Sequence, residues 1–259
     1  MRTSPTPDHL FSDVRLAALY DLFSAGRDDF DFYMKLVTSA ISVLDVGCGT
    51  GALLHMAREA GHSGRLCGVD PAVGMLEQAR RRLDIEWILG DATSIEQKRA
   101  FDLIVMTGHA FQVLVTDAEL QVTLTAIRKL LTDDGRFVFE TRNPLTRAWE
   151  TWTSTKRAEV ADRDGVIVRM GTQVHMPVVG SIVSFTHTFT SPSWDRPQLS
   201  RSTLRFLDPE TLSSFLADAG LAIEKQFGDW DGRPFTAHSP EIITMARRGK
   251  ALASDQDAG

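Results

Sequence analysis

Short apolar runs alternate with amphipathic segments over roughly the first 150 residues of the chain. The runs are rich in β-branched residues, as in residues 43–46 and 101–106. Longer segments between them carry apolar residues at helical spacing, for example Leu120, Leu124 and Ile127. This alternation is typical of βαβ units in a parallel sheet. It predicts strands at residues 43–46, 66–70, 87–90, 101–106 and 136–140, and helices at residues 52–57, 71–83 and 117–131.

The pattern changes near residue 150. Residues 158–189 alternate between apolar and polar positions with a period of two. This predicts an antiparallel meander of three or four strands that runs on to Phe206. A capped helix that ends near Gly220 follows, and two strands, at residues 221–227 and 242–247, return to the main sheet. The chain therefore predicts an α/β fold, with a doubly wound, seven-stranded, mostly parallel sheet and an antiparallel β insertion after the fifth strand.

Two amphipathic segments precede the first strand. Apolar residues repeat at helical spacing from Ser12 to Phe23, and Asp28-Asp29 opens a second helix. Topology allows both helices to cover the carboxyl edge of the sheet as a lid. The predicted organisation is a helical lid at 1–39, a nucleotide-binding core at 40–148, a substrate-covering insertion at 149–206, a completion of the core sheet at 207–249 and a tail at 250–259.

The first predicted strand ends in a loop with three alternating glycines. Gly47, Gly49 and Gly51 allow a sharp turn and leave no Cβ between the backbone and a ligand. The helix that follows directs its free N–H groups to the same space. The next two strands each end in an acid, Asp70 and Asp91. An acid after the second strand is placed to accept both hydroxyls of a ribose.

The spacing of the glycines indicates which nucleotide is bound. A dinucleotide-binding loop needs the spacing G-x-G-x-x-G, which lets the helix approach a pyrophosphate. Here the spacing is G-x-G-x-G, Ala52 follows, and Asp45 lies two residues before the first glycine. An acid at that position is poorly placed beside a pyrophosphate but suits a ligand with an ammonium or sulfonium group. A NAD-type fold is the alternative.

These residues match a D-x-G-x-G-x-G loop. In this respect the chain resembles the class I S-adenosylmethionine-dependent methyltransferases, of the bacterial small-molecule type, over about residues 40–145. The resemblance implies that Asp45 and the loop hold the methionine part of S-adenosylmethionine, Asp70 the ribose and Asp91 the adenine amino group. The full set expected to bind this cofactor is Tyr20, Asp45, Gly47, Cys48, Gly49, Gly51, Asp70, Pro71, Met75, Gly90, Asp91, Ala92 and Thr107.

Some members of this set have a structural alternative. Tyr20, like Tyr33 in the second helix, is equally explained as a core aromatic residue. Core packing is an equal alternative for Met75, which the resemblance places beside the adenine together with Pro71. Cys48 and Cys67 both fall in the nucleotide-binding unit, where small residues are needed, so we interpret them as packing residues.

The fourth predicted strand ends in Met106-Thr107-Gly108-His109-Ala110-Phe111. The resemblance places this end beside the methyl group. Amino methyltransferases of nucleic acid usually have N-P-P-Y or D-P-P-Y here, so the sequence disfavours a base as substrate. His109 is the candidate catalytic residue, since a histidine can act as a general base near neutral pH. The alternative is a structural histidine bonded to backbone.

Candidates for binding the methyl acceptor are Phe111, Arg142, Asn143 and Trp149. Arg142 is able to clamp an acidic group, and its alternative is an ion pair with Glu140 or Asp21. Tryptophans at 149, 152, 194 and 230 are candidates, together with Phe111, for an aromatic pocket, whereas packing in the core or between lobes is the favoured interpretation of each tryptophan taken singly. His175 and His187 have no third ligand at a suitable spacing, so no metal site is expected.

Composition narrows the classes of partner. The net charge of −6 disfavours nucleic acid, since phosphate neutralisation needs clustered Lys and Arg. No apolar run approaches the ~20 residues of a membrane span, and no signal peptide is recognisable, so we expect a cytoplasmic enzyme without a membrane partner. We expect a monomer or homodimer. The resulting hypothesis is methyl transfer to an oxygen or nitrogen of a small molecule, with an RNA methyltransferase or an inactive sensor of S-adenosylmethionine as alternatives.

Overall fold

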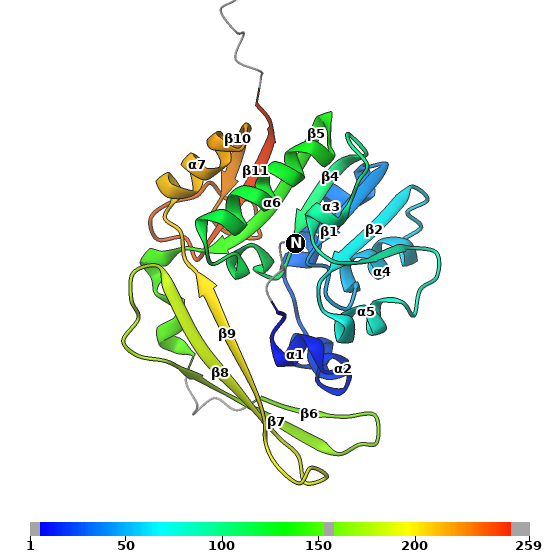
Figure 1. The fold of residues 1–259 in the computed structure, drawn as a ribbon, viewed down its shortest axis with the longest axis vertical. Helices are drawn as coiled ribbons and strands as arrows, with labels where there is room; N and C mark the ends of the chain where they lie inside the picture. Colours follow the sequence, from blue (N-terminus) through cyan, green and yellow to red (C-terminus); the bar gives the residue numbers. More distant parts are fainter. Residues whose placement is uncertain (1–5, 153–157, 250–259) are drawn as a thin grey trace, which may run out of the picture.

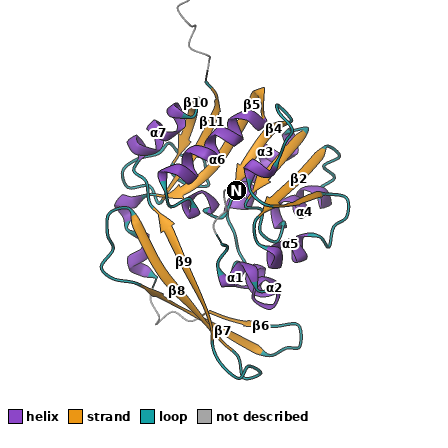
Figure 2. Ribbon diagram, in the orientation of Figure 1, coloured by secondary structure: helices purple, strands orange, loops and turns teal. Residues whose placement is uncertain are grey.

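The fold was analysed in a computed structural model, which describes residues 6–152 and 158–249. It contains two sheets, with helices packed against the larger one (Figures 1 and 2). The expected tail at 250–259 and residues 1–5 of the expected lid lie outside the described residues. Within the described ranges, no helix is both long and apolar enough to cross a membrane.

The larger sheet has seven strands in the order β10-β11-β5-β4-β1-β2-β3. Neighbours from β5 to β3 are parallel, and β11 is antiparallel to both β5 and β10. The doubly wound, mostly parallel sheet predicted from the alternation of strands and helices is therefore confirmed. The strands are β1 (Ser42–Val46), β2 (Arg65–Asp70), β3 (Glu86–Leu89), β4 (Phe101–Met106), β5 (Leu131–Arg142), β10 (Leu221–Phe227) and β11 (Glu241–Arg248).

Helices cover both faces of this sheet. One face is covered by α6 (Asp117–Leu130) and α7 (Pro209–Asp218), and the other by α3 (Asp29–Ser39) and α4 (Ala52–Glu59) (Figure 1). Local signals fix where α6 and α7 begin. Thr116 and Glu119 form a reciprocal capping box at α6, and the Asp208 carboxylate accepts from the Thr211 N–H at α7.

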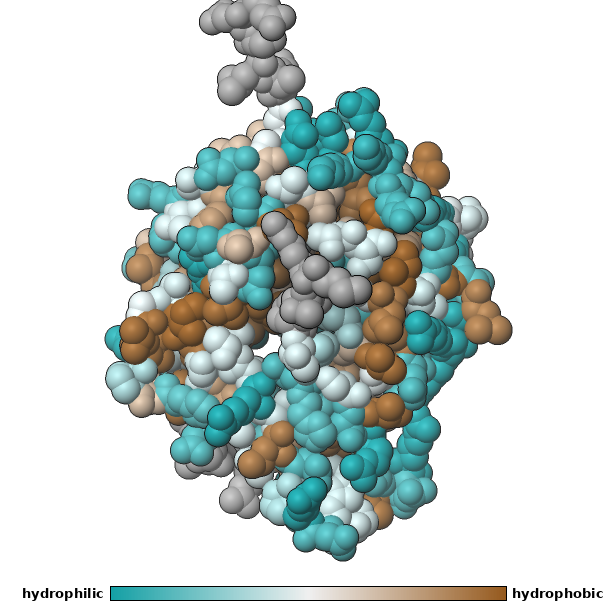
Figure 3. Space-filling view, viewed as in Figure 1, coloured by the Kyte–Doolittle hydropathy of each residue, from teal (hydrophilic) through white to brown (hydrophobic). Residues whose placement is uncertain are grey.

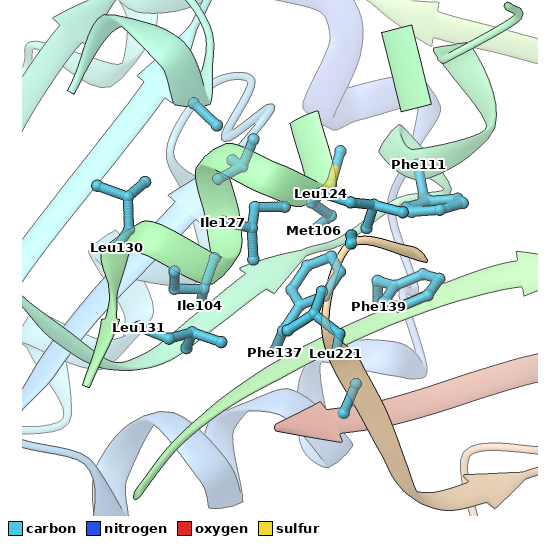
Figure 4. Packing of buried hydrophobic residues seen from close by; sticks show 14 of the residues in the cluster. Ile104, Met106, Phe111, Leu124, Ile127, Leu130, Leu131, Phe137, Phe139 and Leu221 are labelled. Atoms are coloured by element: carbon cyan, nitrogen blue, oxygen red, sulfur yellow. The ribbon is translucent and has the colours of Figure 1, made fainter. Parts of the chain in front are cut away.

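Aromatic residues of β5 form the centre of the core under α6. Phe137 and Phe139 are fully buried and stacked with centroids 4.6 Å apart, and Phe111 stacks on Phe139 at 4.2 Å. Leu124 and Ile127 of α6 close over them (Figure 4). Truncating a phenylalanine in such a core costs about 3–5 kcal/mol, so this packing holds the strands in register beneath the site.

The smaller sheet is an antiparallel meander in the order β6-β7-β8-β9. Its strands are β6 (Ala158–Ala161), β7 (Ile167–Val174), β8 (Ile182–Thr190) and β9 (Gln198–Arg205). One face packs on the N-terminal helices α1 (His9–Ser12) and α2 (Val14–Phe23). Phe23 meets Phe189 edge to face at 5.8 Å, and the Leu10 N–H donates to Ser200 Oγ at 2.8 Å. The period-two pattern thus forms the antiparallel insertion expected after the fifth strand.

Two boundaries differ from the sequence-based expectation. Helix α5 spans Val73–Ala79, shorter than the expected 71–83. Residues 133–135, which lie between the predicted helix at 117–131 and the predicted strand at 136–140, are part of β5. There the pairing with β4 shifts from Phe101↔Leu131 to Leu103↔Arg136, so the extra residues are absorbed as a bulge. The remaining short elements are the 3₁₀ helices η1 (Ala92–Ser94), η2 (Ala110–Val113), η3 (Pro144–Thr146) and η4 (Ala148–Thr151).

Candidate functional site

The glycine loop between β1 and α4 adopts backbone conformations that L side chains rarely take. Gly47, Gly49 and Gly51 have φ values of 73°, 54° and 76°. The loop is tied to the next strand, since the Gly47 N–H donates to the Val69 carbonyl at 2.8 Å. A Cβ on Gly51 would lie 2.4 Å from the Trp87 ring. Both the conformation and the space therefore require glycine here.

Asp70, the last residue of β2, is fixed beside this loop. One carboxylate oxygen accepts from the Gly49 N–H at 2.9 Å, and the other accepts from the Ala72 N–H at 2.8 Å. Burial raises the pKa of Asp70, and the two backbone N–H groups oppose that shift. Each oxygen keeps a second lone pair, so the carboxylate is both oriented and able to accept further hydrogen bonds.

Asp45 in β1 is the most unusual group of the site. It is 1% exposed, and its Oδ1 has no hydrogen-bond partner among the residues that the structure describes. Burial raises the pKa of Asp45 to about 7, the Arg27 guanidinium lowers it, and Asp70 and Glu140 raise it further. An unpaired buried carboxylate is costly to a protein. The arrangement is therefore suited to a ligand that brings a positive charge.

A cavity of about 30 Å³ lies between Asp45, the glycine loop and the N-terminal helices. Among its lining residues are Tyr20, Arg27, Asp45, Gly49, Thr50 and Thr107. Thr50 of the loop donates to Asp21 of α2 at 2.7 Å, which ties the loop to the helix. The structure thus brings together six of the thirteen residues expected to bind the cofactor: Tyr20, Asp45, Gly47, Cys48, Gly49 and Thr107.

The other residues of the expected cofactor set lie outside this cavity. Met75 is buried against Ala72 and Ala17, where α5 meets α2. Asp91 follows Gly90 and accepts from the Thr93 N–H at 2.8 Å. Ala92 is buried in the core beneath α6, Pro71 lies at the half-buried turn after Asp70, and Gly51 caps α4. Their assignment to the cofactor stays a prediction.

His109 follows β4 in a left-handed backbone conformation, with φ of 63°. Its backbone N–H donates to Glu140 Oε1 at 2.6 Å, and its Nε2 lies 3.0 Å from Glu241 Oε2. Burial lowers the pKa of His109 to about 3, so the imidazole is neutral at neutral pH. The partner of the His109 ring is thus the carboxyl group of Glu241 in the last strand. Among the described residues, the ring forms no hydrogen bond to a backbone atom, which was the structural alternative.

Two buried groups brace this position. Glu140 in β5 is fully buried, and its carboxylate accepts a hydrogen bond from the hydroxyl of Tyr33 in α3. Burial raises the pKa of both the Glu140 carboxyl and the Tyr33 hydroxyl. Tyr33 is therefore a core residue, the alternative we had kept for it, whereas Tyr20 lines the cavity.

The residues expected to bind the acceptor are not gathered in one pocket. Arg142 donates to Gln112 Oε1 at 3.1 Å and stacks over Trp152 at 5.1 Å. It forms no ion pair with Glu140 or Asp21 among the described residues. It stays the best placed of the four, since it is directly opposite Glu241 in the pairing of β5 with β11.

Phe111, Asn143 and Trp149 have structural partners that account for them. Phe111 is stacked in the core on Phe139. The Asn143 amide donates to the carbonyls of Ala237 and Ser239, and is fully buried. Trp149 packs edge to face on Phe206 at 4.7 Å, and its buried Nε1 has no partner among the described residues. Acceptor roles for these three stay predictions.

The remaining tryptophans and histidines are dispersed. Trp152 joins Trp149, while Trp194 packs beside α1 and α2 and Trp230 beside Phe32. His175 and His187 are bonded to Thr186 and Thr172, each at 2.9 Å. In the described ranges, no group of three His, Cys, Asp or Glu is arranged to hold a metal ion.

Sequence reasoning missed Arg27, Gln112 and Glu241. Arg27 forms a bidentate pair with Asp29 and reaches the cavity from the link between α2 and α3. Its position before Asp28-Asp29 was a usable signal, since an arginine beside an acidic helix start often pairs with it. Glu241 and Gln112 gave no local signal, because their hydrogen-bond partners are distant in the sequence. Glu241 lies 132 residues from His109, and Gln112 lies 30 residues from Arg142 and 93 from Arg205.

Comparisons with known proteins agree with this geometry. Residues 43–135 match the family model of a methyltransferase domain. The chain is 33% identical over 165 residues to the dTDP-3-amino-3,4,6-trideoxy-alpha-D-glucopyranose N,N-dimethyltransferase of Streptomyces venezuelae, over 59% of this chain and 67% of that protein. It is 31% identical over 130 residues to the malonyl-[acyl-carrier protein] O-methyltransferase of Anoxybacillus flavithermus, over 48% of this chain and 49% of that protein.

A solved structure shows the same fold. The S-adenosylmethionine-dependent methyltransferase from Clostridium acetobutylicum superposes with a TM-score of 0.71 at 18% identity, over 89% of this chain and 96% of that one. At that identity the likeness concerns the fold. The match to the Anoxybacillus protein spans about half the length of that relative.

Proposed function

The chain belongs to the S-adenosylmethionine-dependent methyltransferases, and we propose that it transfers the methyl group to an oxygen or nitrogen of a small molecule. The observation that carries the proposal is the buried, unpartnered Oδ1 of Asp45 beside a loop of glycine N–H groups. Such a carboxylate fits a cationic group, and a NAD-type pyrophosphate would add negative charge where negative charge already accumulates.

The residues present fit S-adenosylmethionine. Asp45 and the glycine loop would hold its cationic amino-acid end, with Tyr20 and Arg27 on the side of the lid. Asp70 is oriented to accept the ribose hydroxyls. When bound, the cofactor supplies a methyl group activated by a sulfonium. The chain contributes position, a site closed to water and, where the acceptor carries a proton, a group to take it.

We infer that the N-terminal helices move to admit the cofactor. The cavity has a volume of about 30 Å³, whereas ligand pockets are usually about 300–1,000 Å³. The Thr50–Asp21 hydrogen bond joins the glycine loop to α2, so α2 is the element that opens and closes. Such a motion would give these helices the lid role that the sequence predicts.

Charge favours a nitrogen acceptor over an oxygen acceptor. The buried carboxyl groups around the site are Asp29, Asp45, Asp70, Glu140 and Glu241, against two arginines, Arg27 and Arg142. The Arg27–Asp29 pair is neutral in sum, so carboxyl groups stay in excess of arginines. Burial raises the pKa of Asp45 to about 7 and that of Glu241 to about 8, and an amine that binds as its ammonium favours their ionised forms. The relative from Streptomyces venezuelae is named as an N,N-dimethyltransferase, which supports the same choice.

The acceptor approaches from the side of the smaller sheet. Figure 3 shows the surface hollowed between this sheet and the main body of the molecule. Arg142, Gln112 and the backbone of Arg205 are linked by hydrogen bonds where β9 meets η2. We place the acceptor there, next to His109, and infer a small molecule because the net charge of −6 disfavours a nucleic-acid partner.

The test is product formation. Purified protein is incubated with radiolabelled S-adenosylmethionine and either a fraction of amine metabolites or bulk RNA. We expect label in the metabolite fraction and none in RNA. Label in RNA alone would contradict the small-molecule assignment, and tight cofactor binding without any labelled product would indicate a sensor.

A further inference from the structure

His109 is fixed from both ends. Its backbone N–H donates to Glu140 Oε1 at 2.6 Å, and its ring Nε2 meets Glu241 Oε2 at 3.0 Å. The side chains of His109 and Glu241 are 19% and 13% exposed, so both lie in a largely dry environment. Among the described residues, no hydrogen-bond partner occupies the other ring nitrogen, Nδ1.

Glu241 is itself held in place by the sheet. It is the first residue of β11 and pairs with Arg142 of β5, and its backbone N–H donates to the Gly228 carbonyl at 3.2 Å. It therefore comes from a rigid strand end rather than from a free loop. A carboxylate on such an element is able to fix the orientation of a partner ring.

We propose that Glu241 is a positioning residue, whose carboxylate holds His109 through Nε2 so that Nδ1 takes the proton of the acceptor. This rests on the proposed function, in which the acceptor is an amine next to His109. Glu241 touches neither acceptor nor cofactor in this account. It acts through the ring of His109.

The chemistry follows from the proton inventory of a neutral imidazole. The ring carries one N–H, and an ionised carboxylate only accepts, so the proton must lie on Nε2 and the lone pair on Nδ1. An acceptor ammonium then gives one proton to Nδ1. Its N–H bond breaks, the electron pair stays on the amine nitrogen, and a new N–H bond forms on the ring. Burial and Arg142 lower the pKa of His109 to about 3, and the ionised Glu241 opposes them because its negative charge stabilises the imidazolium that results.

The protonation state of Glu241 decides whether this is possible. Burial raises the pKa of Glu241 to about 8, and Arg142 opposes the shift while Asp229 and Asp29 add to it. The charged groups that face His109 are Arg142, Glu140, Asp29 and Arg27. A protonated Glu241 would donate to Nε2, which places the ring proton on Nδ1 and blocks the base. Nδ1 therefore becomes available as pH rises and Glu241 ionises.

Nitrogen NMR of the protein with ¹⁵N-labelled histidine, bound to S-adenosylhomocysteine, tests this directly. The resonances of His109 are assigned with His109→Asn and followed from neutral to alkaline pH. We expect Nδ1 of the wild-type protein to lose its proton as the pH passes about 8. In Glu241→Gln, which cannot ionise, we expect no such change.

A matched control is Glu224→Gln. Glu224 is a carboxylate on the neighbouring β10 that pairs with Arg136 on the surface, so this variant should titrate His109 like the wild type. A wild-type Nδ1 that keeps its proton at alkaline pH, or the same tautomer change in Glu241→Gln, would overturn the proposal. The free protein can be titrated in the same way, so failure to bind S-adenosylhomocysteine would count against the proposed function and not against the pair.

Discussion

The two sheets of this protein differ in how they treat polar groups. In the larger sheet, Asp45 and Glu140 are buried carboxylates at the ends of covered strands, and Asp45 Oδ1 has no partner among the described residues. In the smaller sheet, polar side chains pair across strands, as Thr172 does with His187 and Ser184 with Thr203. The larger sheet thus contains a buried carboxylate oxygen that could accept from a cationic group, whereas these hydroxyl and imidazole groups of the smaller sheet bond to each other across strands.

Burial follows the same division. The larger sheet is covered by helices on both faces, so a polar group buried there without a hydrogen bond lowers the stability of the fold. In the smaller sheet, Phe189 and Val183 are buried on one face, whereas Leu199 and Arg169 are exposed on the other. In the function that we propose, a rigid edge of the larger sheet recognises the cofactor. The acceptor is then recognised where the smaller sheet and the N-terminal helices adjoin that edge.

Removing the smaller sheet should produce the largest effect. Replacement of residues 149–206 by a short linker should abolish transfer to the acceptor, because we propose that this segment covers the acceptor. Binding of S-adenosylhomocysteine should be nearly unchanged, since none of the residues that line the cavity belongs to the segment. Calorimetry and turnover of the same preparation measure both, with circular dichroism as the control for folding. Loss of both functions in a folded protein would show that the two sheets are not separable.

Substitution of the proposed base, His109, should have the next largest effect. His109→Asn should slow turnover by roughly 10²–10⁴-fold with little change in cofactor affinity, the range typical of general acid–base catalysis. Because burial lowers the pKa of His109 to about 3, no step from this histidine is expected near its ordinary pKa. Steady-state rates across neutral pH are the measurement. A variant that retains a third of the wild-type rate would leave proximity alone as the source of catalysis.

The sequence indicated more residues of the proposed cofactor side than of the proposed acceptor side. The glycine spacing and the acids that end two strands predicted Asp45 and Asp70, because in a parallel sheet neighbouring strand ends meet at one edge. Glu241 was missed because its contact with His109 depends on the register in which β11 pairs with β5. Periodicity gives the existence of a strand and leaves its register to long-range packing.

The acceptor side shows the same limit. Phe111 was expected to contact the acceptor, but its place in the stack with Phe139 depends on the volume left between β5 and α6. Asn143 precedes Pro144 at the strand exit, as expected, and its amide is used by the carbonyls of Ala237 and Ser239. Those partners come from a loop near the end of the chain, which no local pattern connects to β5.

The unpartnered carboxylate of Asp45 should lower the free energy of unfolding of the protein without ligand. Its folded-state pKa is raised to about 7, above its ordinary value, so the group favours the folded state at low pH, and that contribution is lost as pH rises to about 7. Asp45→Asn does not titrate. The free variant should be more stable than the wild type above neutral pH, by about 1.4 kcal/mol for each unit of pKa shift, and should lose that advantage near pH 4. Thermal unfolding across this range checks it, and a variant less stable at every pH would be a contradiction.

A smaller effect is expected at the ribose acid. Asp70→Ala should lose hydrogen bonds to a charged acceptor, each about 1.5–3 kcal/mol, and hence at least about tenfold in affinity for S-adenosylhomocysteine. Asp84→Ala is the matched control, since Asp84 is an exposed acid that pairs with Arg82 in the same half of the chain. Calorimetric titration measures both. Equal affinities for the two variants would remove Asp70 from the cofactor site.

We propose that the Asp45 carboxylate binds the cationic group of the cofactor. The pH dependence of S-adenosylhomocysteine binding tests this most directly. Calorimetric titrations of wild type and Asp45→Asn are compared from acid to mildly alkaline pH. We predict that wild-type affinity rises up to pH about 7, where Asp45 ionises, and then levels off. We predict that Asp45→Asn binds at least about tenfold more weakly at pH 8, with no such rise. Equal affinities of the two proteins at pH 8, with the same pH dependence, would contradict the account.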